Sequence, residues 1–223
     1  MGKLLQSSKQ IYKTKQEYVY QTLRDAIMHC ELMPGEKLVI KNIADQLSVS
    51  TIPVREALQL LHTEELVNYS PHVGTIVTPI SKSDIIEAFT VKEGLETAAV
   101  RIAVEKATKE DLAKLKKQLE AMDDFLEKKN HEDWGGLNRQ FHLAITDITS
   151  MSMLKEMHVK VLNKWDRIRR YYFHEVLAHR HVQSQKEHYA IVDAMASEKS
   201  KEAEQWIRKH NLNALHDYMR HIG

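Results

Sequence analysis

The sequence predicts a mostly α-helical protein made of a small N-terminal domain and a larger C-terminal helical domain. Apolar residues make up 43% of the 223 positions, which is enough for packed cores in two domains. Seven glycines and four prolines are few for this length, so long loops are not expected. Apolar side chains recur every three or four residues along most of the chain, and only one short region alternates as strands do.

The N-terminal part contains three predicted helices, at 15–29, 41–47 and 51–64. In the first, Tyr18, Leu23 and Ile27 share one face. Pro34 and Gly35 mark a turn before the second helix. The spacing of the second and third helices leaves only a tight connection between them.

The third helix is followed by a small predicted hairpin. Ser50 is suited to cap this helix, and Pro53 is tolerated in its first turn. Residues 66–70 and 74–80 then alternate around "PHVG", which predicts two short strands with Gly74 at or near the turn. Three helices and a hairpin in this order match a winged helix-turn-helix, whose second helix of the pair enters the major groove of DNA.

From residue 81 the pattern changes to long helices without a strand signal. Six helices are predicted, at 83–106, 109–129, 131–149, 153–178, 183–197 and 199–222. Ser81, Thr108, Ser150 and Ser200 lie near helix starts. The sequence therefore predicts an antiparallel α-helical bundle over 81–223, after a DNA-binding domain at 1–80.

The charge pattern limits how this protein can bind a polyanion. The formal net charge is +1, and the first 80 residues hold eight Lys and Arg against eight Asp and Glu. DNA affinity must therefore come from charges placed locally. The N-terminal arm is one such place, with Lys3, Lys9, Lys13 and Lys15 and no acidic residue.

The compartment expected from the sequence is the cytoplasm. Cys30 is the single cysteine, so no intramolecular disulfide can form, as suits a reducing environment. The first residues lack the apolar core of a secretion signal, and no apolar run is long enough to span a membrane.

The start of the third helix carries residues suited to DNA. Ser50 and Thr51 lie where free backbone N–H groups favour a phosphate. Arg55 faces away from the apolar stripe, and its guanidinium can bind a phosphate or a guanine edge. The same spacing also fits an ordinary solvated helix face, and the pattern alone leaves both readings open.

Thirteen histidines are unusual for this length, and three of them suggest a metal site. His142, His188 and His210 lie on three helices among apolar neighbours, and imidazole suits zinc and nickel. Ordinary core histidines are the alternative. A metal-dependent hydrolase is a remote alternative, because it would need a general base beside the metal. Glu187, next to His188, would point about 100° away from it on a helix, and no other general base is indicated.

Motifs in the first 80 residues resemble the GntR family of bacterial transcription regulators. They are "LMPGEKL", "IADQLSVS", "PVREALQLL", "EELV" and the glycine of "HVGTIV", in the order and spacing of that family. The resemblance implies DNA contacts from Lys41, Ser50, Thr51, Pro53, Arg55, His72 and Gly74. Thr51 stands where the family usually has an arginine that often reads guanine, and Val73 replaces a frequent basic residue. Either a different operator sequence or a lower affinity for DNA is therefore expected.

The rest of the chain resembles the FCD ligand-binding domain of the FadR/VanR-like branch. The motifs are "VKEGLETAAVRIAV", "NRQFHLAIT", "EHYAIVDAM" and "RKHNLNAL", and six helices favour the shorter VanR-like form. The resemblance implies a divalent transition metal, zinc or nickel, held by Asn138, His142, His188 and His210. Asn138 stands where the family usually has aspartate, and an amide is the poorer ligand.

The resemblance also implies a small organic acid as effector, bound beside the metal. Lys92 stands where an arginine is common, and Arg101 is a second candidate to pair with the anion. Arg167, Arg169 and Arg170 are further candidates, although such a cluster is more often a solvated face or an interface.

The expected protein is a ligand-responsive, DNA-binding transcription regulator and not an enzyme. A homodimer would bind a near-palindromic double-stranded operator, and the effector would alter that binding. The alternative is the same regulator with a metal-free helical dimerisation domain.

Overall fold

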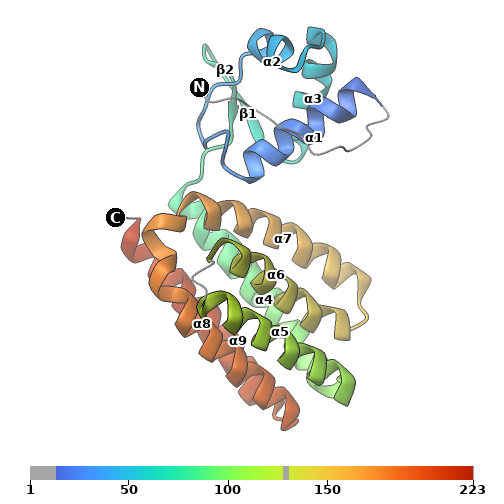
Figure 1. The fold of residues 1–223 in the computed structure, drawn as a ribbon, viewed down its shortest axis with the longest axis vertical. Coiled ribbons are helices and arrows are strands. Elements are labelled where there is room, and N and C mark those ends of the chain that lie inside the picture. Colours follow the sequence, from blue (N-terminus) through green and yellow to red (C-terminus); the bar gives the residue numbers. More distant parts are fainter. Residues whose placement is uncertain (1–13, 128–130, 223) are drawn as a thin grey trace. The chain divides into compact units, whose positions relative to one another are not determined.

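A computed structural model describes residues 14–127 and 131–222 (Figure 1). The chain divides after Ile80 into two compact units. In the described residues the first unit contains α1 (Lys15–Met28), α2 (Ile40–Leu47), α3 (Thr51–Thr63), β1 (Val67–Ser70) and β2 (Gly74–Val77). The second contains α4 (Lys82–Lys106), α5 (Lys109–Glu127), α6 (His131–Ile148), α7 (Ser152–Tyr171), α8 (Phe173–Ala196) and α9 (Ser200–His221). None of the described helices is both long and apolar enough to cross a membrane.

The first unit folds around the packing of α1 on α3. Thr14 caps α1 by accepting a hydrogen bond from the backbone N–H of Glu17. Leu23 and Ile27 of α1 and Leu61 of α3 belong to one buried apolar cluster. The predicted mostly helical fold with a small hairpin is confirmed, and the helix boundaries agree to within one residue in this unit.

The wing is a two-stranded antiparallel hairpin in which Ser70 pairs with Gly74. Gly74 has a φ of +98°, a conformation that side chains disfavour, and this explains a glycine where the chain reverses. The segment before α2 runs along β2, since Leu38 N–H donates to the Thr75 carbonyl. The hairpin is thereby fixed to the helices from one side.

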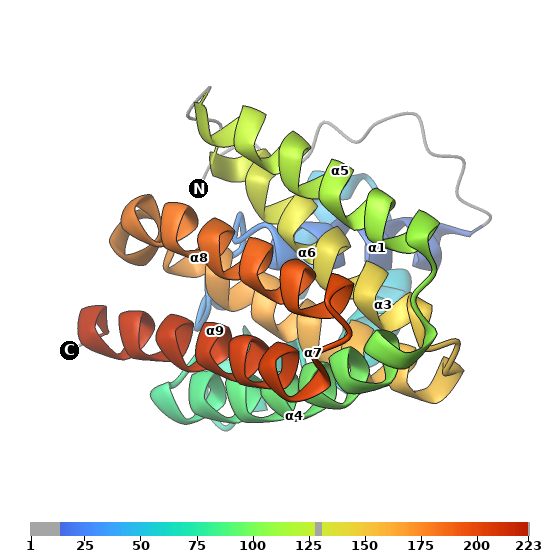
Figure 2. The ribbon, with the colours of Figure 1, turned by 90° about the horizontal axis from the view of Figure 1, so that it is seen from below.

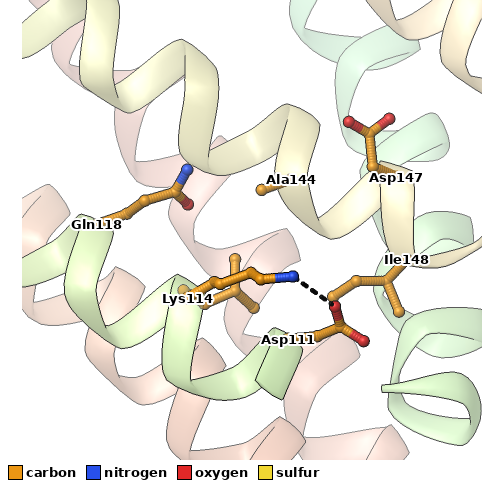
Figure 3. Close-up of a pocket in the computed structure, with 7 residues that line it drawn as sticks. Asp111, Lys114, Gln118, Ala144, Asp147 and Ile148 are labelled. Carbon is orange, nitrogen blue, oxygen red and sulfur yellow. Dashed lines mark ion pairs between the residues drawn. The ribbon is translucent and has the colours of Figure 1, made fainter. Parts of the chain in front are cut away.

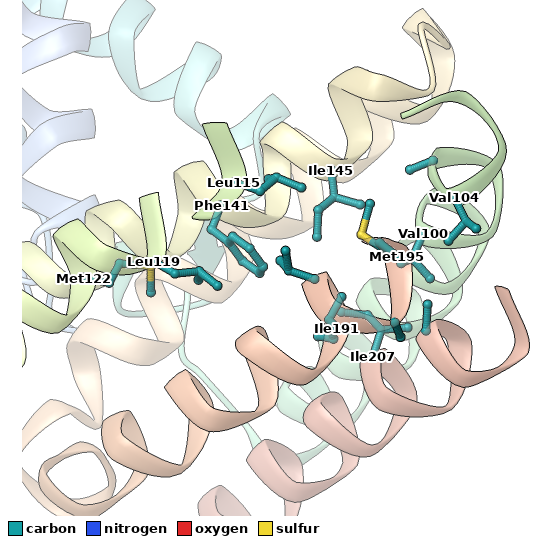
Figure 4. Packing of buried hydrophobic residues seen from close by; sticks show 14 of the residues in the cluster. Val100, Val104, Leu115, Leu119, Met122, Phe141, Ile145, Ile191, Met195 and Ile207 are labelled. Carbon is teal, nitrogen blue, oxygen red and sulfur yellow. The ribbon is translucent and has the colours of Figure 1, made fainter. Parts of the chain in front are cut away.

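The second unit is a bundle of long helices, with α9 beside both α4 and α8 (Figure 2). Helix α5 packs on α6 and α8, and both α6 and α7 pack on α4. Ser81 and Asp84 form a capping box at the start of α4. The core is an apolar cluster contributed by five helices (Figure 4), including Val100, Leu115, Phe141, Ile191 and Ile207.

One predicted helix boundary is wrong. The sequence suggested a break at about 179–182, whereas the break lies at Tyr172 and α8 runs through that stretch. The polar residues there resembled a connection, but Arg180 within that stretch and Gln185 just after it are buried. Gln185 donates to the Leu119 carbonyl and Arg180 pairs with Glu187, so the bundle satisfies them internally.

Candidate DNA interface and metal centre

Helix α3 presents one polar face and buries the other. Ser50, Thr51 and Arg55 are exposed, whereas Val54 and Ala57 are buried in the core of the unit. Ser50 takes the N-cap position, yet its side chain makes no capping hydrogen bond. The start of α3 therefore combines a hydroxyl not used in capping with the uncapped N–H groups of a helix N-terminus.

The other residues predicted to contact DNA differ in their placement. Lys41 on α2 and His72 at the wing tip are exposed, and Gly74 is half-buried. Pro53 is buried on the core side of α3, which suits a structural role in the first turn. Lys15 is the first residue of α1. The remaining lysines of the predicted arm, Lys3, Lys9 and Lys13, lie outside the described residues.

Three helices of the second unit bring three imidazoles together. His142 on α6, His188 on α8 and His210 on α9 are all buried. One ring nitrogen from each lies within 4.8 Å of the others. The ring centroids are 5.2 Å apart for His142 and His188, and 4.7 Å apart for His188 and His210. This spacing suits three ligands of a single ion.

Two of these imidazoles face carboxylates of neighbouring helices. Nδ1 of His142 lies 2.9 Å from Oε1 of Glu96, and Nδ1 of His210 lies 2.8 Å from Oε2 of Glu187. Metal-bound histidines commonly donate their second ring N–H to a carboxylate, which fixes the tautomer and the ring orientation. Glu187 stands in that position with a hydrogen bond to His210, and Glu96 lies beside His142 at a similar distance without forming a hydrogen bond in the described structure.

The imidazoles leave ring nitrogens inside the bundle for a further partner. His188 Nδ1 lies 3.5 Å from Gln185 Oε1, while the Nε2 atoms of His188 and His142 have no hydrogen-bond partner among the residues that the structure describes. Buried polar atoms are normally paired, so such nitrogens call for an explanation. A divalent ion satisfies both at once, and the residues present therefore fit a metal.

Glu96 is the centre of a buried polar network. Its Oε2 lies 2.8 Å from Lys92 Nζ and 2.7 Å from Asn211 Nδ2, and Lys92 also donates to Asn211 Oδ1 at 2.8 Å. His158, which is fully buried, places Nε2 3.1 Å from Glu96 Oε1 and Nδ1 2.7 Å from Thr146 Oγ1. Lys92 is therefore neutralised inside the bundle by a partner one turn along α4.

Glu187 is held in a similar way by groups from α8 and α9. Arg180 Nη1 donates to its Oε1 at 3.1 Å, and Asn213 Nδ2 donates to the same oxygen at 2.7 Å. Arg180 also donates to the His210 carbonyl at 3.0 Å. The carboxylate that faces His210 is thus fixed by several independent bonds.

Burial keeps the imidazoles neutral at pH 7. It lowers the pKa of His142 to about 3 and holds the pKa of His188 well below its usual value. Burial also lowers the pKa of His210, although the bond to Glu187 opposes the shift. Neutral imidazoles have the lone pair that binds a metal.

The two carboxylates stay ionised despite their burial. Desolvation raises the pKa of Glu187, but the bonds from His210 and Arg180 outweigh it and bring the pKa to about 2. Desolvation likewise raises the pKa of Glu96, but its interactions with His142 and Lys92 outweigh this and hold the pKa well below its usual value. The side chains of Glu96 and Glu187 therefore place negative charge next to His142 and His210.

The other predicted site residues lie in different surroundings. Asn138 is buried on α6, four residues before His142, and Arg101 is exposed on α4. Arg167 and Arg169 are buried, whereas Arg170 is half-buried, so this cluster is not a solvated face.

A separate cavity of about 270 Å³ lies between α5 and α6 (Figure 3). It carries charges of both signs, with Lys114 Nζ 4.0 Å from Asp111 Oδ1. None of the residues predicted from the sequence lines it.

Sequence reasoning missed the two carboxylates that face the imidazoles, those of Glu96 and Glu187. Lys92 and Glu96 are four apart on one helix, and this spacing was a readable signal for their pairing. Glu187 was expected to point away from its neighbour His188, and its carboxylate bonds His210 on the next helix. Only the fold shows that partner.

The two units match two known protein families. Residues 15–77 match the model of "Bacterial regulatory proteins, gntR family", and residues 87–213 match the "FCD domain" model. The second match alone covers more than half of the chain.

Relatives of known name and structure agree with these matches. The HTH-type transcriptional regulator McbR of Escherichia coli is 34% identical over 77% of this chain and 77% of its own. The regulator YdhC of Bacillus subtilis is 27% identical over 91% and 90% of the two chains. The solved structure of E. coli McbR/YncC superposes with a TM-score of 0.72 at 26% identity, covering 93% of this chain and 100% of that one. The chain therefore belongs to the GntR family, carries an FCD domain, and is a transcription regulator rather than an enzyme.

Proposed function

We propose that the first unit binds a near-palindromic double-stranded operator as part of a homodimer. Helix α3 enters the major groove and the wing contacts the neighbouring backbone, as in other winged helices. The contacts are Lys41, Ser50, Thr51, Arg55, His72 and Gly74. The exposed Arg55, opposite the buried face of α3, is the observation that supports this assignment most directly.

The test of this interface is the substitution Arg55→Ala in the full chain. Operator binding should fall at least tenfold, because a charged contact to phosphate or guanine is lost. Arg208→Ala is the matched control, since Arg208 is an exposed arginine of the second unit that pairs with Glu93. Equal DNA affinity of Arg55→Ala and the native protein would exclude the role of Arg55.

The second unit, in this proposal, binds a divalent transition metal through His142, His188 and His210, with zinc or nickel preferred. The observation that carries it is the buried triad, whose ligand nitrogens lie within 4.8 Å of one another. Asn138, one turn from His142, adds an amide rather than a charged ligand. Glu96 and Glu187 orient two of the imidazoles and supply negative charge near the ion.

The charges of this site support an organic acid as effector. Lys92 is balanced by Glu96 and Arg180 by Glu187, and the imidazoles are neutral. A divalent ion therefore leaves excess positive charge inside the bundle, where unpaired charge is costly. The ion, when bound, supplies a Lewis-acidic centre with coordination positions open to a carboxylate.

Regulation follows if the acid binds two shapes of the dimer with different affinity. Only such a difference lets the effector change the equilibrium between them. The separation of the two α3 helices then changes, and operator affinity changes with it. By linkage, operator DNA must alter the affinity for the acid by the same factor.

Elemental analysis of the untagged, purified protein tests the metal directly. We expect about one divalent transition ion per chain, and loss of that ion in the double variant His142→Ala/His188→Ala. A His216→Ala variant, on α9 but outside the triad, should retain it. Native protein that stays metal-free after supply of zinc, nickel and manganese would overturn the proposal. The helical unit would then be a metal-free dimerisation domain.

The effector is tested with a panel of small mono-, di- and tricarboxylic acids. At least one should raise the melting temperature of the metal-loaded protein and change its operator affinity. The chelator-treated protein should lose both responses, because the carboxylate then has no ion to bind. Responses that are equal with and without metal would place the acid elsewhere.

A further inference from the structure

Helix α3 begins with an apolar side chain that the fold leaves in solvent. Ile52 is 66% exposed, more than any other large aliphatic side chain in the described residues of the first unit. It follows Thr51 and precedes Arg55 by three positions, and both of these are exposed as well. The side chains that fix α3 to its own domain, such as Val54, are fully buried on the other side.

The side chain of Ile52 contributes little to the apolar core of the first unit. Burial of an aliphatic side chain stabilises by roughly 25 cal/mol per Å², and Ile52 forgoes most of that gain in the free protein. A partner surface that covers it recovers the gain. In the proposed operator complex, the surface that faces the first turn of this helix is the major groove, where the thymine C5-methyl is the apolar group on the base edges.

We propose that Ile52 is a specificity-determining residue that reads a thymine methyl in each operator half-site. Thr51 beside it adds a second methyl, together with a hydroxyl that can reach a base or a phosphate. This inference rests on the proposed operator contacts of α3 and is independent of the metal and the effector. It predicts T·A pairs at the positions facing the first turn of the helix.

The experiment begins with selection of binding sites from random duplex DNA by the full-length protein. Each thymidine of the selected site is then replaced in turn by deoxyuridine, which removes only the C5-methyl. We expect one or two positions in each half-site to lose affinity by about fourfold per methyl, the effect of one buried carbon. The variant Ile52→Ser should show no such loss at the position that Ile52 reads.

Two further variants assign the contact. Leu60→Ser removes another exposed aliphatic side chain of α3, two turns away, and should keep the full thymidine-to-deoxyuridine difference. Thr51→Ser keeps the hydroxyl of Thr51 and removes its methyl group. If only this variant abolished the thymidine-to-deoxyuridine difference in affinity, Thr51 would be the residue that contacts the thymine methyl, and the role of Ile52 would be overturned. Because Ile52 is exposed, Ile52→Ser should retain the native melting temperature.

The remaining outcomes also decide the question. Equal affinity for thymidine and deoxyuridine at every position would overturn the inference while leaving the operator contacts intact. An equal loss in the native protein and in Ile52→Ser would overturn it as well. Selection that enriches no sequence would overturn sequence reading altogether, and with it the proposed contacts of α3.

Discussion

The Nδ1 atom of His210 on α9 lies 2.8 Å from Oε2 of Glu187 on α8, so a carboxylate of one helix orients an imidazole of the next. If His210 binds a metal, loss of this charge should weaken the binding. Glu187→Gln keeps the size of the side chain and removes the charge. Metal affinity should fall about 10- to 100-fold, which competition with a chromogenic chelator measures.

The control for Glu187→Gln is Asp193→Asn, which neutralises an exposed acid on the same helix. It should leave metal affinity unchanged. Glu187→Gln also leaves Arg180 without its buried partner, so the melting temperature of the metal-free protein should fall as well. An unchanged metal affinity together with a lowered melting temperature would give Glu187 a structural role only.

The sequence was sufficient to predict the helices and strands whose apolar periodicity is regular, and to identify the residues that carry family motifs. Helical spacing indicated only that His142, His188 and His210 could meet in the bundle, and the resemblance to the FCD domain is what marked them as metal ligands. The groups behind the triad were not predictable, because Glu96 and Glu187 meet their histidines across helix interfaces. Pairings between distant segments depend on how helices pack, and helical spacing does not encode that.

The break between α7 and α8 was misplaced for a related reason. A polar stretch usually marks a connection, and the sequence around Arg180 is polar. Here the polarity serves a buried network, in which Arg180 reaches Glu187 and the backbone of His210. A polar residue inside a helical bundle looks like a surface residue until its partner is known.

The metal-free protein should lose stability as the pH falls below neutrality. In the unfolded chain His142 binds a proton near pH 6.5, whereas burial lowers its pKa to about 3 in the folded state. Between these values the unfolded state holds more protons, so stability is complete above pH 6.5 and declines as the pH falls towards 3. Each such histidine contributes a slope of about 1.4 kcal/mol per pH unit.

Urea unfolding of chelator-treated protein at pH 7.5 and pH 5.5 measures this slope. His142→Gln, which does not titrate, should show a smaller difference between the two pH values than the native chain. A native midpoint that is the same at both pH values would mean that the imidazoles are protonated alike in the folded and unfolded states.

Two adjacent glycines on α6 should respond in opposite ways to alanine. A Cβ on Gly135 would overlap the guanidinium of Arg169, which is itself buried, whereas a Cβ on Gly136 would meet nothing. Gly136→Ala should stabilise by about 1 kcal/mol through helix propensity. Gly135→Ala should destabilise by about 1–3 kcal/mol, because Arg169 must leave its packed position.

Chemical denaturation of both variants gives the comparison directly, since each makes the same change in the same helix. Gly135 lies three residues before Asn138 on α6, so the metal content of Gly135→Ala is also informative. If both variants were stabilised equally, the packing of Arg169 over Gly135 would not restrict that position.

The exposed Thr51 gives the operator preference a second test. Arginine at this position can bind O6 and N7 of guanine with two hydrogen bonds, which threonine cannot. Site selection with Thr51→Arg should therefore enrich a G·C pair at the position that faces residue 51. The preference over the native operator should be about 1–3 kcal/mol in binding free energy.

Thr51→Lys separates geometry from charge, because lysine brings the same charge without the planar fork of arginine. It should raise affinity for all duplexes alike and steepen the salt dependence, with little change of sequence preference. If Thr51→Arg and Thr51→Lys selected the same sequences, residue 51 would contact the phosphate backbone and not a base. The sequence preference of α3 would then rest on Arg55 and on the apolar contact of Ile52.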